Sequence, residues 1–341
     1  MTNLTGKQNI WFSTFIFVVS GGLSTIVSQW QDTSILAGSS YSHPAIQDFV
    51  FELALSLSYL PYYLSYKHIP SSSFKQKAKF LYIGVMNSIE SILLSIGLFK
   101  VGASLYQISK ASVLLFTVAF SIPIIGRKPN KKQIIGVGIS ATSICMIGLS
   151  SSKLSFENAG IIIIVLSQLV SGFNAVMEEK LLSETTIHNT ECIGIEGIGG
   201  LLFNTIILIP IFCSARCDIS ESCLNGRREN ISLAIKQTLG TYIGVTQTFL
   251  IMIATMCYNI SSISLNFTLG ATTRAVIDCG RMLLVWVFCL SAQWEKFTLI
   301  QLLAYAGISL GIIIYNDLLP SPRENINNAK ITNYGTYYGK I

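Results

Sequence analysis

The chain has 341 residues, of which 51% are hydrophobic and only 12% are charged, and its formal net charge is +6. This length could hold two or three soluble domains, but so low a charged fraction excludes that interpretation and indicates a protein that uses lipid as its solvent. The positive charge is scattered, and no basic block with interleaved aromatic residues occurs. Nucleic acid is therefore not expected as a partner.

Apolar stretches long enough to cross a bilayer recur along the chain. A spanning helix needs roughly 20 mostly apolar residues, because the hydrocarbon core is about 30 Å thick and each residue rises about 1.5 Å. The first stretch has full spanning length and no clear small-x-small cleavage site, so we expect a retained helix rather than a signal peptide. The sequence predicts an all-α integral membrane protein with ten transmembrane helices, at residues 10–29, 43–66, 77–97, 103–125, 132–150, 158–178, 192–213, 239–259, 268–291 and 298–316.

Basic residues predict the orientation of these helices. With a cytosolic N-terminus, Lys75 and Lys77 follow the second stretch and Arg127 and Lys128 follow the fourth, all on the cytosolic side. This distribution agrees with the positive-inside tendency. Both termini, including the tail at residues 317–341, are therefore expected in the cytosol.

The loop after the seventh stretch then faces the lumen or the exterior, where disulfides persist and Asn-x-Ser sequences are glycosylated. Cys217 and Cys223 are candidates for a disulfide, although free thiols at the membrane edge fit the spacing equally well. Asn230 begins an Asn-Ile-Ser sequence and is the candidate glycosylation site.

The chain also matches itself weakly at an offset of about half its length. This match pairs Gln133 with Gln301 and Lys110 with Asp278. It predicts two five-helix repeats, at residues 10–150 and 158–316. Five is an odd number, so the second copy must enter the membrane from the opposite face. Many secondary transporters use such an inverted repeat around a site at the midplane.

The ninth stretch carries Arg274, Asp278 and Arg281, whose spacing places them on one helical face. A charge at the bilayer centre costs roughly 2.5–3.5 kcal/mol, so this face must point into the bundle or a water-filled cavity. Lys110 is expected to face Asp278. An interhelical salt bridge that only holds the halves together is the structural alternative. The predicted substrate-binding residues are Lys110, Gln107, Thr272, Thr273, Arg274, Asp278 and Arg281.

Because this set has three cations and one anion, a cation is left to bind a carboxylate or phosphate of the solute, as arginine does well. Glu52, Glu90 and Glu196 are the candidates for proton or ion coupling, since burial in a medium of low dielectric raises proton affinity. Asp48 and Glu196 could instead lie at the interface, the interpretation that we favour for Asp48. The run Glu178-Glu179-Lys180 is interpreted as a solvated helix end.

The residues give no sign of catalytic chemistry. His43, His68 and His188 belong to no metal-ligand spacing and do not form the arrangement of a histidine and an acid that lipid acyl transfer uses. No Gly-x-Ser-x-Gly sequence and no phosphate-cradling loop is present. Neither an enzyme, a metal site nor a cofactor is therefore expected.

Several of these sequences together resemble the drug/metabolite transporter superfamily, and within it the F branch of solute carrier family 35, in particular its member-six type. The resemblance covers nearly all of residues 10–317. It departs from the family pattern at Lys110, where the family has Arg, and near Asn87 and Glu90, where the family has Asp. The sequences that carry it are Ala271-Thr272-Thr273-Arg274-x-Val276-x-Asp278-x-x-Arg281, Gly194-x-Glu196-Gly197-x-x-Gly200, Glu178-Glu179-Lys180, Gln107-x-x-Lys110, His43-Pro44 and Trp294-Glu295.

The resemblance implies two inverted five-helix repeats, cytosolic termini, and a central cavity lined chiefly by the fourth and ninth helices. We expect an alternating-access transporter or exchanger of a small polar metabolite, anionic or zwitterionic, similar to the nucleotide-sugar transporters. A receptor or scaffold that does not transport is the alternative. An internal membrane of the lysosome, vacuole, Golgi or endosome is expected rather than the plasma membrane, and Tyr338-Gly339-Lys340-Ile341 fits a sorting signal. A homodimer is left open.

Overall fold

The computed structural model describes residues 2–60, 63, 73–98, 101, 106, 109–150, 156–185, 187–215, 229–294 and 298–315. These residues are mostly helical, and the prediction of a multi-pass membrane protein is confirmed. The count of ten spans and their inverted repetition stay predictions. Five described helical segments are long and apolar enough to cross a membrane: Ile10–Thr33, Phe74–Leu98, Ala159–Glu184, Asn189–Ser214 and Tyr242–Leu269.

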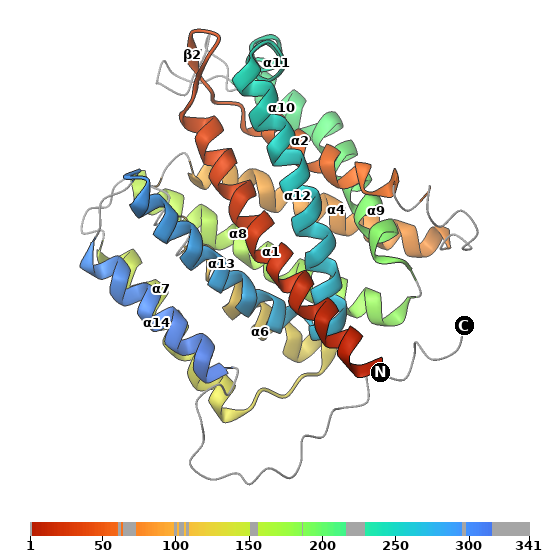
Figure 1. Ribbon diagram of the computed structural model, residues 1–341, viewed down its shortest axis with the longest axis vertical. Coiled ribbons are helices and arrows are strands. Elements are labelled where there is room, and N and C mark those ends of the chain that lie inside the picture. The colour runs from red at the N-terminus through yellow and green to blue at the C-terminus, as the bar shows by residue number, and fades with distance from the viewer. Residues whose placement is uncertain are drawn as a thin grey trace.

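The first half of the chain contains a small hairpin besides its helices. The strands β1 (Ile35–Leu36) and β2 (Ser39–Ser40) pair antiparallel, which departs slightly from the all-α prediction. Ala37 and Gly38 have φ values of 51° and 85°, as expected in a tight hairpin turn. The helices are α1 (Thr2–Thr33), α2 (Pro44–Leu57), α4 (Phe74–Leu98), α6 (Val113–Ile125) and α7 (Lys131–Ser150) (Figure 1).

The described residues of the second half form helices and short connections, without strands. A π-helical turn, η1 (Asn204–Leu208), interrupts the segment between α9 and α10, and single π turns of this kind are frequent at functional sites. Gly270 alone joins α12 to α13, with a left-handed φ of 84° that favours glycine. The helices are α8 (Phe156–Glu184), α9 (Asn189–Phe203), α10 (Ile209–Ser214), α11 (Ile231–Leu239), α12 (Tyr242–Leu269), α13 (Ala271–Ser291) and α14 (Leu299–Tyr315).

The two ends of the bundle differ in what closes them. The hairpin, the start of α2 and α11 lie together at one end, which we call the hairpin end (Figure 1). There, Gln237 of α11 donates from Nε2 to the carbonyl oxygens of Leu36 and Ser39, at 2.9 and 3.1 Å. The junction between α12 and α13 and the connection between α6 and α7 lie at the other end (Figure 1), which we call the Gly270 end after the residue that forms this junction.

The fourth predicted span is not one continuous helix. Residues 109 and 110 are helical, but Ala111 and Ser112 form a turn before α6 begins at Val113. Short-range bonds of the i to i−3 type mark this break, from Ser112 N to Ser109 O (3.2 Å) and from Leu115 N to Ser112 O (3.0 Å). The span predicted at 103–125 therefore contains a break, which apolar composition does not reveal because it carries no information on local backbone hydrogen bonding.

The two halves of the sequence interlock. The strongest helix pairings between elements join one half to the other: α1 with α12, α4 with α8 and α9, α6 with α8, α2 with α9, and α7 with α14. Figure 1 shows α7 and α14 side by side at one edge, with α1 lying against α12 and α13. The predicted repeats are therefore not separate packing units, and a space between them is enclosed by both.

Candidate functional site

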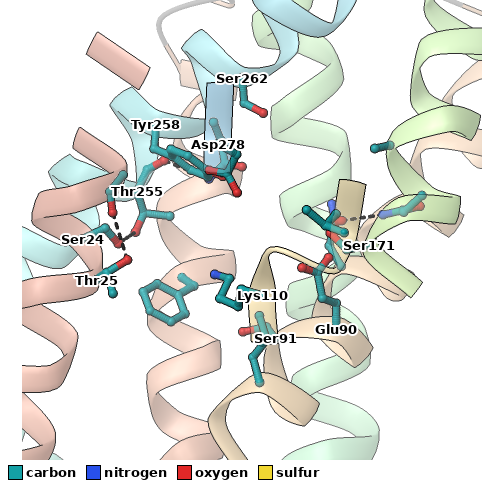
Figure 2. Close-up of a pocket in the computed structure, with 18 of the residues that line it drawn as sticks. Ser24, Thr25, Glu90, Ser91, Lys110, Ser171, Thr255, Tyr258, Ser262 and Asp278 are labelled. Carbon is teal, nitrogen blue, oxygen red and sulfur yellow. Dashed lines mark hydrogen bonds between the residues drawn. The ribbon is translucent and has the colours of Figure 1, made fainter. Parts of the chain in front are cut away.

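A cavity of about 260 Å³ lies between helices α1, α2, α4, α6, α8, α9, α12 and α13. Neither α7 nor α14 contributes a described lining residue. Figure 2 shows Ser24, Thr25, Thr255 and Tyr258 on one side of this cavity, Glu90 and Ser171 on the opposite side, and Lys110 between them. The described charged residues that line it are Glu52, Glu90, Glu178, Glu196, Asp278, Lys110, Arg274 and Arg281.

Helix α13 places Arg281 deep inside this cavity, with only 2% of the residue exposed. Its Nε lies 2.6 Å from Asp278 Oδ1. Its Nη1 donates to the carbonyl oxygen of Gly21 (3.2 Å) and to Thr25 Oγ1 (3.1 Å), both on α1. The guanidinium also lies over the ring of Tyr258, 5.4 Å from its centroid. A buried arginine is therefore held by a carboxylate, an aromatic face and a second helix.

Arg274 lies nearer the Gly270 end and has its own carboxylate. Its Nη1 donates to Ser262 Oγ at 2.7 Å and lies 3.5 Å from Glu178 Oε2. Asn266 donates to the same Glu178 oxygen at 2.9 Å. Glu178 is 7% exposed, so its interpretation as part of a solvated helix end was wrong: the inner face of α8 carries this side chain into the cavity.

Glu179, the next residue, also differs from that interpretation. Its Oε2 accepts from Ala271 N at 2.8 Å and so caps the first turn of α13, while its Oε1 pairs with Arg127. Arg127 Nη1 also donates to Thr272 Oγ1 at 2.6 Å. This contact at the Gly270 end joins the loop after α6 to the start of α13.

Two predicted substrate-binding residues lie outside the cavity. Thr272 is the acceptor for Arg127, and neither Thr272 nor Thr273 lines the cavity. The first turn of α13 lies at the end of the bundle rather than at its middle, and a binding role for these two residues stays a prediction. Gln107 lies outside the described residues.

Lys110 lines the cavity at the break that precedes α6. Its Nζ lies 5.3 Å from the centroid of the Tyr106 ring, a cation–π geometry. Asp278 and Glu90 are its carboxylate neighbours, and no carboxylate of the described residues lies within 4 Å of its Nζ. The break thus places a half-buried lysine in the cavity just before α6 begins.

The predicted coupling residues Glu52, Glu90 and Glu196 all line the cavity. Glu52 is 2% exposed and Glu196 6%. Asp48, one turn before Glu52, is fully buried and accepts hydrogen bonds from Ser88 (2.6 Å) and Asn204 (2.8 Å). The interfacial position favoured for Asp48 was wrong, since α4 and η1 supply buried donors to it.

A second buried contact closes the hairpin end. His43 Nδ1 lies 2.7 Å from Glu229 Oε1, and Glu229 Oε2 accepts from Ala45 N at 3.2 Å in the first turn of α2. Burial, together with the carboxylates of Asp32 and Glu229, raises the pKa of Tyr41, which packs against the His43 ring. A neutral Tyr41 therefore covers this contact.

The structure describes only part of the loop after α10. Cys217 and Cys223 lie outside the described residues. Asn230 is the N-cap of α11, and its side-chain oxygen accepts from Leu233 N at 3.2 Å. Among the residues in the described ranges, no group of three or more His, Cys, Asp or Glu side chains could hold a metal ion.

Sequence reasoning missed several residues of the site. Thr25, Ser262 and Tyr258 are ordinary residues of apolar helices until a charged partner is known. Glu178 gave no such signal either, because the predicted stretch ends at that residue, and only the longer helical segment Ala159–Glu184 places it inside the bundle.

Comparison with known proteins agrees with this architecture. Residues 10–149 match the EamA-like transporter family. The chain is 26% identical over 337 residues to solute carrier family 35 member F6 of Mus musculus, covering 89% of this chain and 87% of that protein. The resemblance to this branch of the drug/metabolite transporters is confirmed. The human protein of the same name is 25% identical over 332 residues, with the same coverage.

A more distant relative in Schizosaccharomyces pombe, an uncharacterized protein, is 23% identical and is covered over 97% of its length. One solved crystal structure has the same fold, with a TM-score of 0.58 at 11% identity, over 90% of this chain and 98% of that one. The relatives point to a membrane transporter rather than an enzyme.

Proposed function

We propose that the protein is a secondary-active transporter of a small polar metabolite that works by alternating access. The observation that carries this proposal is the buried charge set around Arg281. A charged side chain at bilayer depth is costly and marks a solute or ion pathway by default. A membrane scaffold does not need such a cavity.

The helix pairings support an inverted repeat. Taken in chain order, the helices equivalent in the two predicted repeats are α1 and α8, α2 and α9, α4 and α12, and α6 and α13. If each helix is exchanged for its equivalent, the pairing of α1 with α12 becomes that of α8 with α4. In the same way, the pairing of α6 with α8 becomes that of α13 with α1, and the pairing of α2 with α12 becomes that of α9 with α4. All six pairings occur. Two halves related in this way can rock about a central site and open it to either side.

The two end contacts suit such a cycle. Arg127 with Glu179 joins the halves at the Gly270 end, and His43 with Glu229 joins them at the hairpin end. We propose that one contact breaks as the cavity opens at that end while the other stays closed. Alternating access requires that both ends are never open together.

The charge balance narrows the solute class. Five described carboxylates and three described basic groups line the cavity, so the expected excess of cations is replaced by an excess of acids. Arg281 and Lys110 suit a carboxylate or phosphate of the solute. A zwitterion fits this cavity better than a simple anion.

The expectation of an internal membrane stays a proposal, since its sorting sequence at Tyr338–Ile341 lies outside the described residues.

The test of transport begins with thermal stabilisation of the purified protein by nucleotide sugars, nucleotides, amino acids and organic anions. A ligand that binds the folded state raises its Tm by mass action. The stabilising compound is then supplied as a radiolabelled solute to proteoliposomes.

We expect Arg274→Gln to lower uptake at least tenfold while the protein stays monodisperse, because Arg274 lies in the cavity between Glu178 and Ser262. Lys128→Gln is the matched control, since Lys128 is exposed and lies outside the cavity. A protein that binds no compound of the panel and shows no flux under any gradient would contradict the proposal and favour a scaffold.

A further inference from the structure

Three described carboxylates of the cavity have no basic nitrogen within 4 Å: Glu90, which has Lys110 and Ser171 as neighbours, and the pair formed by Glu52 and Glu196. Among the described residues, no Lys, Arg or His nitrogen lies within 4 Å of Glu52 or Glu196, whereas Arg281 pairs with Asp278 and Arg274 with Glu178. Glu52 Oε2 has no hydrogen-bond partner in the described part of the chain. The contact described for Glu196 is with Cys192 Sγ, at 3.5 Å. Burial of polar groups without partners is unfavourable, so a cationic ligand would stabilise this pair.

The glycine sequence on α9 is built around the same two residues. A Cβ atom at Gly197 would lie 2.2 Å from Ser56 N, and one at Gly194 would lie 2.6 Å from Tyr59 Cβ. These glycines therefore bring the backbone of α9 against that of the α2 segment, as small residues do between membrane helices. The close approach places Glu52 of α2 beside Glu196 of α9.

Gly200, one turn after Glu196 on α9, directly contacts the Glu52 side chain. A Cβ atom there would lie 2.2 Å from both Cδ and Oε2 of Glu52. The carboxylate therefore occupies the space that any other residue at this position would fill. Glu52 can lie at this place in the cavity because Gly200 has no side chain. This evidence for a built site does not depend on which carboxylates have a basic partner.

The side chains around Glu52 and Glu196 suit an ammonium group better than a metal ion. The described residues contain no group of three or more His, Cys, Asp or Glu side chains that could hold a metal ion. Ser28 Oγ, on a residue that is 8% exposed, also lines the cavity and has no partner among the described residues. An ammonium group carries three donors, which the oxygens of two carboxylates can accept.

We infer that Glu52 and Glu196 form a subsite for the ammonium group of the transported solute, while Lys110 and Arg281 hold its carboxylate or phosphate. The inference rests on the proposed transport function and deepens it, because it names the solute as a zwitterion whose charges are separated along the cavity.

The experiment uses probes of matched length. Succinate, γ-aminobutyrate and 1,4-diaminobutane share a four-carbon chain and differ in their charged ends, and glutarate, 5-aminovalerate and 1,5-diaminopentane form the same series with one more carbon. The twenty amino acids complete the panel. Stabilisation is measured on the full-length protein in detergent, together with size-exclusion profiles that confirm folding.

We expect at least one zwitterion to stabilise the wild type more than the dicarboxylate of its series. Glu52→Gln and Glu196→Gln should each weaken its apparent affinity roughly tenfold or more, because a charge-assisted hydrogen bond is lost. Asp48→Asn is the matched control: Asp48 lies one turn away on α2 and is buried, but it does not line the cavity. It should change the affinity less than twofold.

Two results would overturn the inference. The first is that no probe with an ammonium group binds. The second is that both Gln variants keep their affinity for the zwitterion. In that second case, loss of the pH dependence of uptake in the variants would identify the pair as a proton site. If dicarboxylates bind and are transported in place of zwitterions, the transport proposal stands and only this subsite fails.

Discussion

Arg281 Nε and Asp278 Oδ1 lie 2.6 Å apart, one turn from each other on the same face of α13. Arg281 is 2% exposed, and α1 supplies two further acceptors for its guanidinium. The pair therefore holds two helices from different halves of the sequence together, at the place where the solute is proposed to bind.

We expect Asp278→Asn to lower the free energy of unfolding by about 3 kcal/mol, since removal of one partner leaves a buried charge uncompensated. The Tm in detergent should fall clearly. The double variant Asp278→Asn with Arg281→Gln should be less destabilised than the sum of the two single variants. Strict additivity of the three Tm changes would show that the two residues do not interact.

Gly200→Ala tests the space in which the Glu52 carboxylate lies. The added methyl group would overlap Glu52 Cδ, and overpacking of this kind costs about 1–3 kcal/mol. Gly280→Ala is the matched control on α13, because a Cβ there meets no atom within 4 Å. We expect a lower Tm for Gly200→Ala and an unchanged or slightly higher Tm for Gly280→Ala. Equal Tm values for the two variants would contradict the packing described.

The α7–α14 interface depends on small residues. A Cβ at Gly311 would lie 2.2 Å from Ser140 Oγ and 2.6 Å from Gly136 O, so the two backbones approach closely. Gly311→Leu should separate the helices and lower the Tm by several degrees. Gly138→Leu should be tolerated, since Gly138 is exposed and its Cβ position is open. A tolerated Gly311→Leu would mean that the helices are farther apart than described.

Reversal of charges tests the contact at the Gly270 end. Arg127→Glu and Glu179→Arg should each lower the Tm, and the double variant should recover only part of the loss. Recovery is partial because Glu179 also caps α13 at Ala271 N, a cap worth about 1 kcal/mol that an arginine cannot supply. Lys128→Glu, on the exposed neighbour of Arg127, is the control. Full recovery in the double variant would rule out the capping role.

Some features of the site follow from the sequence because they depend only on local geometry. The spacing of Arg274, Asp278 and Arg281 places them on one face whatever the rest of the chain does, and lipid excludes that face. The weak self-match selected Lys110 as a residue of the same site. The family resemblance also followed from the sequence, since it rests on residues at fixed spacing.

Other features depend on how helices approach one another, which no local pattern specifies. The partner of Arg274 is Glu178, the first residue of a run expected in solvent, because α8 turns that side chain inward. Asp48 is buried because α4 and η1 bring donors to it.

The sequence by itself determined that the chain lies in a membrane and that α13 turns a charged face inward, since bilayer thickness and helical periodicity act on neighbouring residues. Only the tertiary structure decided which carboxylate pairs with which cation. Electrostatic attraction falls off within a few ångströms, so these pairs depend on the relative positions of helices far apart in the chain. The same packing brings acidic residues of α2, α4, α8 and α9 to the cavity, and the expected excess of cations there is an excess of acids.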